Sequence, residues 1–184
     1  VVATGATSAY LYVLRGRGDG SFVRRIRYEL DGSVQASVAL GDLNEDGNTD
    51  VAACTINGSN TQIRFGQNDG RFGPETNVVG SNPGPVRLAD VDGDAHLDLL
   101  VLYRFSQVVH VLLGDGHGDF ASPLSFSVPP QARSFELGDL DGDGQIEIVT
   151  CHETGTVAVL PNLGGGSFGA ALRTTVGGVL QSLA

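Results

Sequence analysis

A nine-residue acidic segment occurs three times in this chain at almost constant spacing, and this repetition constrains the fold more than any other feature. The copies read DLNEDGNTD from Asp42, DVDGDAHLD from Asp90 and DLDGDGQIE from Asp139, so their starts lie 48 and 49 residues apart. Each copy has oxygen-bearing side chains at positions 1, 3, 5 and 9 and a glycine at position 4 or 6. Such a loop can wrap a hard cation, because Ca2+ takes about six to eight oxygen ligands.

A second marker repeats with the same period. Glycine-rich turns end at Phe22, Phe72, Phe120 and Phe168, which lie 50, 48 and 48 residues apart. The chain therefore consists of about four units of about 48 residues. No window shows helical spacing with caps, so we predict an all-β chain with four short strands in each unit. The clearest predicted strands are 86–89, 97–102, 108–113 and 120–126 in one unit, and 134–137, 146–151, 156–160 and 168–173 in the next.

Four-stranded units of this length are typical of β-propeller blades. A β-sandwich is the alternative for an all-β chain, but it does not explain the constant period. We predict a single propeller domain over 1–184 with about four blades, or a fragment or half of a larger propeller. The predicted parts are a partial blade over 1–32, blades over 33–81, 82–130 and 131–176, and a first strand over 177–184 that completes the partial blade. This incomplete blade, made from the N-terminal strands and the C-terminal strand, lacks an acidic loop.

Composition excludes two classes of partner. The formal net charge of -10 argues against nucleic acid, because phosphate binding needs a basic surface. No apolar run approaches the roughly 18 residues needed for membrane insertion. Cys54 and Cys151 hold the same position in two different repeats, and we predict that both are buried free thiols.

The acidic segments and the glycine-phenylalanine turns together resemble the FG-GAP or VCBS-type repeat family, whose propellers include those of integrin α subunits and of some fungal and bacterial lectins. The resemblance covers almost the whole chain. It implies that each acidic loop joins the first two strands of a blade and holds one Ca2+, giving about three ions. The implied ligands are the side chains at positions 1, 3, 5 and 9 and the carbonyl at position 7, namely Asp42, Asn44, Asp46, Asn48 and Asp50; Asp90, Asp92, Asp94, His96 and Asp98; and Asp139, Asp141, Asp143, Gln145 and Glu147.

Three departures from the family pattern predict sites of unequal affinity, the third being the strongest. Asn44 is neutral, Ala95 stands where position 6 is usually glycine, and Glu147 is one methylene longer than aspartate. An EF-hand is excluded, because position 12 holds Ala53, Val101 or Thr150 where a bidentate glutamate is needed.

The sequence carries no recognisable catalytic constellation, so we predict that the chain is not an enzyme. The main predicted function is a calcium-stabilised binding or adhesion module that is extracellular or at the cell surface. The alternatives are a carbohydrate-binding lectin with sites between blades, or an accessory domain of a larger extracellular enzyme. The expected partner is a protein or glycan ligand, and a homodimer that completes a larger ring is a further prediction. Candidate ligand-binding residues on the third strands are Tyr10, Tyr12, Asn60, Gln62 and His110.

Overall fold

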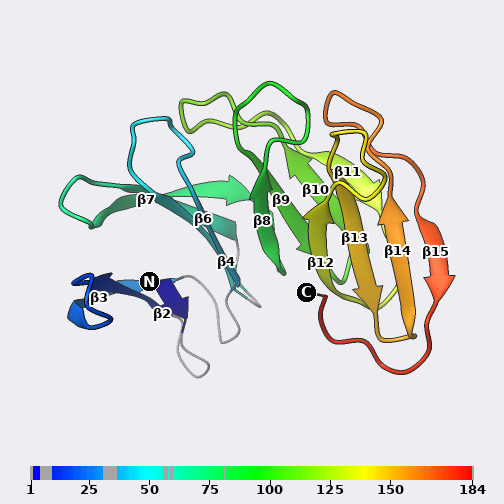
Figure 1. Cartoon of the computed structure of the whole chain (residues 1–184), viewed down its shortest axis with the longest axis horizontal. Coiled ribbons are helices and arrows are strands. Elements are labelled where there is room, and N and C mark those ends of the chain that lie inside the picture. Colours follow the sequence, from blue (N-terminus) through cyan, green and yellow to red (C-terminus); the bar gives the residue numbers. More distant parts are fainter. Residues whose placement is uncertain are drawn as a thin grey trace. The chain divides into compact units, whose positions relative to one another are not determined.

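The computed structural model describes residues 2–4, 10–30, 37–55, 58, 60–80 and 82–183. All regular elements in these ranges are strands, arranged in one three-stranded and three four-stranded antiparallel sheets (Figure 1). No helix in the described part of the chain is long and apolar enough to cross a membrane. The predicted all-β class is confirmed, and the repeated four-stranded sheets have the form of propeller blades. The chain forms two compact units, Val1–Val86 and Arg87–Ala184, which are described separately.

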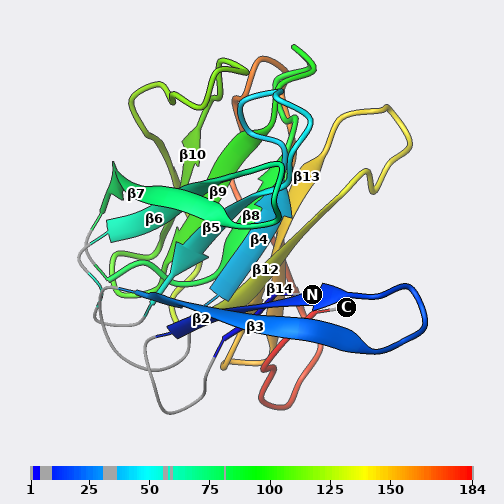
Figure 2. The same cartoon turned by 90° about the vertical axis from the view of Figure 1, so that its left-hand side faces the viewer.

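The first unit contains two sheets in which each strand pairs with the next one along the chain. One sheet contains the long N-terminal hairpin, drawn in blue in Figure 2, and the next four strands form the other, drawn in cyan to green. Leu11 from the first sheet and Val51 and Ala53 from the second are buried in one apolar cluster. The strands are β1 (Val2–Thr4), β2 (Tyr10–Gly16) and β3 (Phe22–Glu29), then β4 (Ser37–Gly41), β5 (Asp50–Cys54), β6 (Asn60–Gly66) and β7 (Phe72–Val79).

The second unit repeats this arrangement with two four-stranded sheets. One sheet contains β8 (Val86–Ala89), β9 (Asp98–Tyr103), β10 (Val108–Leu112) and β11 (Leu124–Ser127). The other contains β12 (Ala132–Gly138), β13 (Glu147–His152), β14 (Thr156–Leu160) and β15 (Leu172–Thr175).

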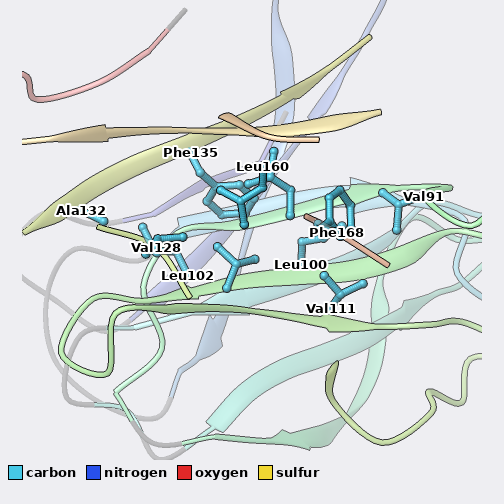
Figure 3. Close-up of a cluster of buried hydrophobic side chains, with 11 residues drawn as sticks. Val91, Leu100, Leu102, Val111, Val128, Ala132, Phe135, Leu160 and Phe168 are labelled. Carbon is cyan, nitrogen blue, oxygen red and sulfur yellow. The ribbon is translucent and has the colours of Figure 1, made fainter. Parts of the chain in front are cut away.

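The core of the second unit lies between its two sheets (Figure 3). Leu100 and Leu102 on β9 and Val111 on β10 face one way because successive side chains of a strand alternate. Phe135 and Leu160 of the other sheet pack against them, and both are fully buried. Each sheet thus buries one face against its neighbour, as consecutive blades of a propeller do.

The fourth strands begin later than predicted. Phe120 and Phe168 form only isolated bridges, with Gly114 and Asn162, and regular pairing resumes at β11 and β15. Before β11 the ladder is interrupted at Pro123, which has no N–H to donate.

The predicted strand over 177–184 is not formed within 177–183. The N–H groups of Val176 and Gly177 both donate to the carbonyl of Gly155, and Gly177 and Gly178 have φ of 82° and 74°. This left-handed backbone is incompatible with an extended strand. Ala184 and the predicted blade boundaries at 32, 33 and 81 lie outside the described residues. Pairing of the two chain ends stays a prediction.

Candidate metal centres and ligand groove

The three acidic loops occupy equivalent places in three sheets. They connect β4 to β5, β8 to β9 and β12 to β13, as the family resemblance implies. The carboxylate at position 1 of each loop accepts the backbone N–H of position 6, at 2.9 Å from Gly47 to Asp42, 2.9 Å from Ala95 to Asp90 and 3.1 Å from Gly144 to Asp139. Each loop therefore closes around its first carboxylate.

The carboxylate at position 5 accepts the N–H of position 7 at 2.8 Å in all three loops. This bond lowers the pKa of Asp46 and Asp143, because the N–H stabilises the charged form. Both carboxylates therefore keep the charge that a cation ligand requires. The N–H groups in these bonds come from the position 7 residues Asn48, His96 and Gln145. That their backbone carbonyls bind the ion stays a prediction.

The acid at position 9 also accepts hydrogen bonds from two backbone N–H groups. Asp98 is fully buried, and its two oxygens accept the N–H of Val91 at 2.8 Å and that of Gly114 at 2.9 Å. Asp50 does the same with Leu43 and Gly66, both at 2.7 Å. These bonds tie the acidic loop to the glycine-phenylalanine turn of its own sheet.

Burial of Asp50 and Asp98 has an electrostatic consequence. It raises the pKa of Asp50, and it raises that of Asp98 to about 6, because water no longer stabilises the charged form. The pKa of Asp92 is raised for the same reason. A cation placed beside such carboxylates would replace the lost solvation.

Two of the loops bring three carboxylates together. Ligand oxygens of Asp90, Asp92 and Asp94 lie within 4.8 Å of one another, as do those of Asp139, Asp141 and Glu147. The second loop thus gathers positions 1, 3 and 5, whereas the third gathers positions 1, 3 and 9. Within the described residues the first loop forms no such carboxylate group, because its position 3 is Asn44. The oxygen donors of the two acidic triads fit a hard divalent cation.

The backbone at positions 4 and 6 is left-handed in every loop. The third loop has glycine at both positions, with φ of 80° at Gly142 and 88° at Gly144. The other two each place one non-glycine residue there, Glu45 with φ 55° and Ala95 with φ 75°. The family pattern marks Ala95 as a departure from glycine, but it does not single out Glu45.

A groove of about 520 Å3 lies in the first unit, beside the first acidic loop. Its apolar lining includes Leu14, Leu40 and Phe72, and Phe72 packs edge-on against Tyr28 at 5.8 Å between ring centroids. Its polar lining residues are Arg15, Asn48, Thr49, Gln67, Asn68 and Arg71. Asn48 is also anchored to the acidic loop, since its Nδ2 donates to Asp46 at 2.9 Å.

The sequence interpretation treated the turn of this groove only as a repeat marker. Gln67, Asn68 and Asp69 stand there, where the corresponding turns have Asp115, Gly116 and His117 or Leu163, Gly164 and Gly165. The signal that could have revealed the groove is this concentration of amide side chains in one repeat.

The ligand candidates of the third strands are dispersed. Tyr10 and Tyr12 lie 6.2 Å apart between ring centroids, and the Arg27 guanidinium lies 4.4 Å from the Tyr10 centroid. Gln62 is buried, Asn60 is half-buried, and His110 stacks on Tyr103 at 4.4 Å. The ligand role of these side chains stays a prediction.

The blade-like sheets define a repeat protein of the β-propeller class, and its acidic loops carry the oxygen donors that suit a cation. The FG-GAP-like repeat matches residues 1–53, 42–101 and 90–150, so the chain belongs to this family. None of the curated proteins matches the sequence.

Two solved structures match the chain, the first of them with a similar fold. An Agrocybe aegerita lectin, whose structure concerns recognition of non-reducing terminal N-acetylglucosamine, has a TM-score of 0.62 and 24% identity, covering 93% of this chain and 48% of the lectin. The chain thus spans about half the length of that lectin. The Photorhabdus luminescens Tc holotoxin pore has a TM-score of 0.47 and 16% identity, covering 87% of this chain and 9% of that protein.

Proposed function

We propose that this chain is a non-enzymatic carbohydrate-binding propeller module whose acidic loops hold calcium. The groove beside the first loop carries the proposal, because it combines amide and guanidinium groups with an aromatic ring and aliphatic side chains. Amides pair with sugar hydroxyls, and apolar surfaces contact the C–H faces of sugar rings. The fold shared with a fungal lectin supports the same reading.

The second unit offers a weaker alternative. One of its grooves, of about 390 Å3, is lined by Ser125, Ser127 and Arg173 together with apolar side chains, and it has no amide side chain in its lining. The groove of the first unit therefore has more of the chemistry that recognises a sugar.

Calcium has a structural part in this proposal. The acidic triads Asp90, Asp92, Asp94 and Asp139, Asp141, Glu147 would hold ions in two loops. Bound Ca2+ supplies positive charge that offsets the repulsion among these carboxylates. In the first loop Asp42, Asn44 and Asp46 would hold a weaker ion, and Asn48 would transmit loop order to the wall of the groove. We also propose an extracellular location, where millimolar Ca2+ fills weak sites.

The groove is tested by binding to a glycan array in Ca2+, including glycans that end in N-acetylglucosamine. We expect at least one class of glycan to bind. Asn68→Ala and Gln67→Ala should each weaken binding about fivefold, because each removes about one neutral hydrogen bond. The matched control is His117→Ala, an exposed residue of the equivalent turn in the second unit, which should leave binding unchanged. Folded protein that binds no glycan would contradict the proposal and favour a protein ligand.

A further inference from the structure

Asn162 breaks the pattern of the glycine-phenylalanine turns. The equivalent residues are Gly66 and Gly114, and a Cβ at either would lie 2.3 Å from the carbonyl oxygen at position 8 of the acidic loop, that of Thr49 or Leu97. Such a contact is sterically forbidden, so the first two repeats require glycine. The third repeat accommodates a side chain at this place.

The longer acid at position 9 explains this accommodation. Glu147 replaces the aspartate of the other loops, and its Oε1 lies 3.5 Å from the N–H of Asn162, whereas Asp50 and Asp98 hold their glycines at 2.7 and 2.9 Å. The extra methylene sets the turn farther from the loop. The space admits the Asn162 side chain, so Glu147 and Asn162 act as a matched pair.

The Asn162 amide joins two acidic loops. Its Nδ2 donates to the carbonyl of Ile146 at 3.1 Å, in the third loop, and to the carbonyl of Val91 at 2.9 Å, in the second. Its Oδ1 accepts the N–H of Gly164 at 2.9 Å, and the residue is 7% exposed. Every hydrogen-bonding group of this buried amide is therefore used, which fixes its orientation.

The whole turn that carries Asn162 is seated on the second loop. Phe168 packs in the same cluster as Val91, beside which it lies in Figure 3. A Cβ at Gly166 would lie 2.7 Å from Leu113 and 3.5 Å from the Cβ of Asp92, a member of the second acidic triad. A displacement of the turn would thus move atoms that pack against Asp92.

A continuous path of hydrogen bonds follows. Val91 donates its N–H to Asp98 and accepts Asn162 Nδ2 on its carbonyl, and Asn162 directs its N–H at Glu147 of the third acidic triad. We propose that Asn162 is a positioning residue that couples cation binding in the second and third loops. This inference rests on the proposed calcium sites. An ion bound in the third loop would order Glu147 and so hold the turn that carries Asn162. That turn would then order the second loop. The coupling between the two ion affinities must be reciprocal.

The test compares Asn162 with the glycine arrangement of the other repeats. The double variant Glu147→Asp with Asn162→Gly recreates the Asp98 and Gly114 pair and removes the bridge. Asp46→Asn in every protein weakens the first loop, so that calorimetric Ca2+ titration reports the other two. Adding Asp141→Asn, which weakens the third loop, should lower the affinity of the second loop about fivefold or more when Asn162 is present and Ca2+ is too dilute to fill the weakened third loop. In the double variant, Asp141→Asn should change the Ca2+ affinity of the second loop less than twofold.

Metal-free unfolding in EDTA tests the matched pair independently. The double variant should be more stable than Glu147→Asp alone, because the shorter acid would draw the Asn162 Cβ toward the Ile146 carbonyl. The opposite order would contradict the pairing. An equal loss of second-loop affinity in both backgrounds would overturn the bridge while leaving the calcium sites intact. Cooperatively unfolding proteins that bind no Ca2+ would instead show that the proposed calcium sites are wrong, and the coupling with them.

Discussion

At the scale of single residues, the acidic loops differ in how easily their backbone adopts the required shape. Positions 4 and 6 are left-handed in each loop, and glycine adopts this conformation without the steric cost that a Cβ adds. Ala95 in the second loop and Glu45 in the first bear that cost, and the third loop avoids it with Gly142 and Gly144. That the third site binds its ion most strongly stays a prediction.

Ala95→Gly should therefore raise the free energy of unfolding by about 1 kcal/mol, since φ of 75° is strained for alanine. Urea unfolding with Ca2+ present measures the change. The control is Ala121→Gly, an exposed alanine that is not among the positive-φ residues, where added chain freedom should lower stability. Equal losses in both variants would show that the second loop is unstrained.

At the scale of elements, one buried histidine ties the end of β13 to the segment before β12. His152 is fully buried, and its Nδ1 lies 3.1 Å from the carbonyl of Pro130 and its Nε2 2.8 Å from the hydroxyl of Thr150. A carbonyl can only accept, so Nδ1 carries a proton, and Nε2 accepts from the Thr150 hydroxyl when the imidazole is neutral. Burial favours this neutral form in the folded protein.

This arrangement predicts a loss of stability in mild acid. Burial lowers the pKa of His152 below the ordinary 6.5, and the positive charge of Arg173 acts in the same direction. His152 takes up a proton near pH 6.5 in the unfolded chain and only at lower pH in the folded chain. Its protonation therefore does not affect stability well above pH 6.5, and it destabilises the folded chain as the pH falls below that value. The free energy of unfolding then falls by at most about 1.4 kcal/mol per pH unit from this one histidine.

The measurement is urea unfolding between about pH 7.5 and 5.5 in saturating Ca2+, compared with His152→Gln. The glutamine side chain of the variant does not titrate, so subtracting its curve removes contributions shared by both proteins. The stability of the wild type relative to the variant should decline as the pH falls through the ordinary histidine pKa of 6.5. Parallel curves would show that His152 is protonated equally in the folded and unfolded chains.

Elements were predictable from the sequence where burial is complete. β9 is buried along its whole length, and its apolar run predicted its position to within one residue. The fourth strands were placed too early, because the phenylalanine that marks the turn is paired only as a bridge. Local patterns show which side chains seek the core, but ladder hydrogen bonds depend on the partner strand.

At the scale of the whole molecule, the repeat period carried most of the correct prediction. Repetition in register identified the all-β class, the blade-like sheets and the loops that join the first two strands of each. It could not show that position 9 is buried and shared with a neighbouring turn, as Asp98 is with Gly114. Nor could it show the Asn162 bridge or the amide-lined groove, because these depend on contacts between segments far apart in the chain.

Thermal unfolding in excess Ca2+ and in EDTA tests whether the acidic loops hold calcium and thereby stabilise the fold. An ion that binds only the folded chain stabilises it by about 2.7 kcal/mol at 100 times its dissociation constant. For a chain of this size that corresponds to a rise in melting temperature of about 5 to 10 °C. Asp141→Asn should reduce the rise, because Asp141 belongs to the third acidic triad. A melting temperature that is the same in Ca2+ and in EDTA would show that the acidic loops hold no stabilising ion.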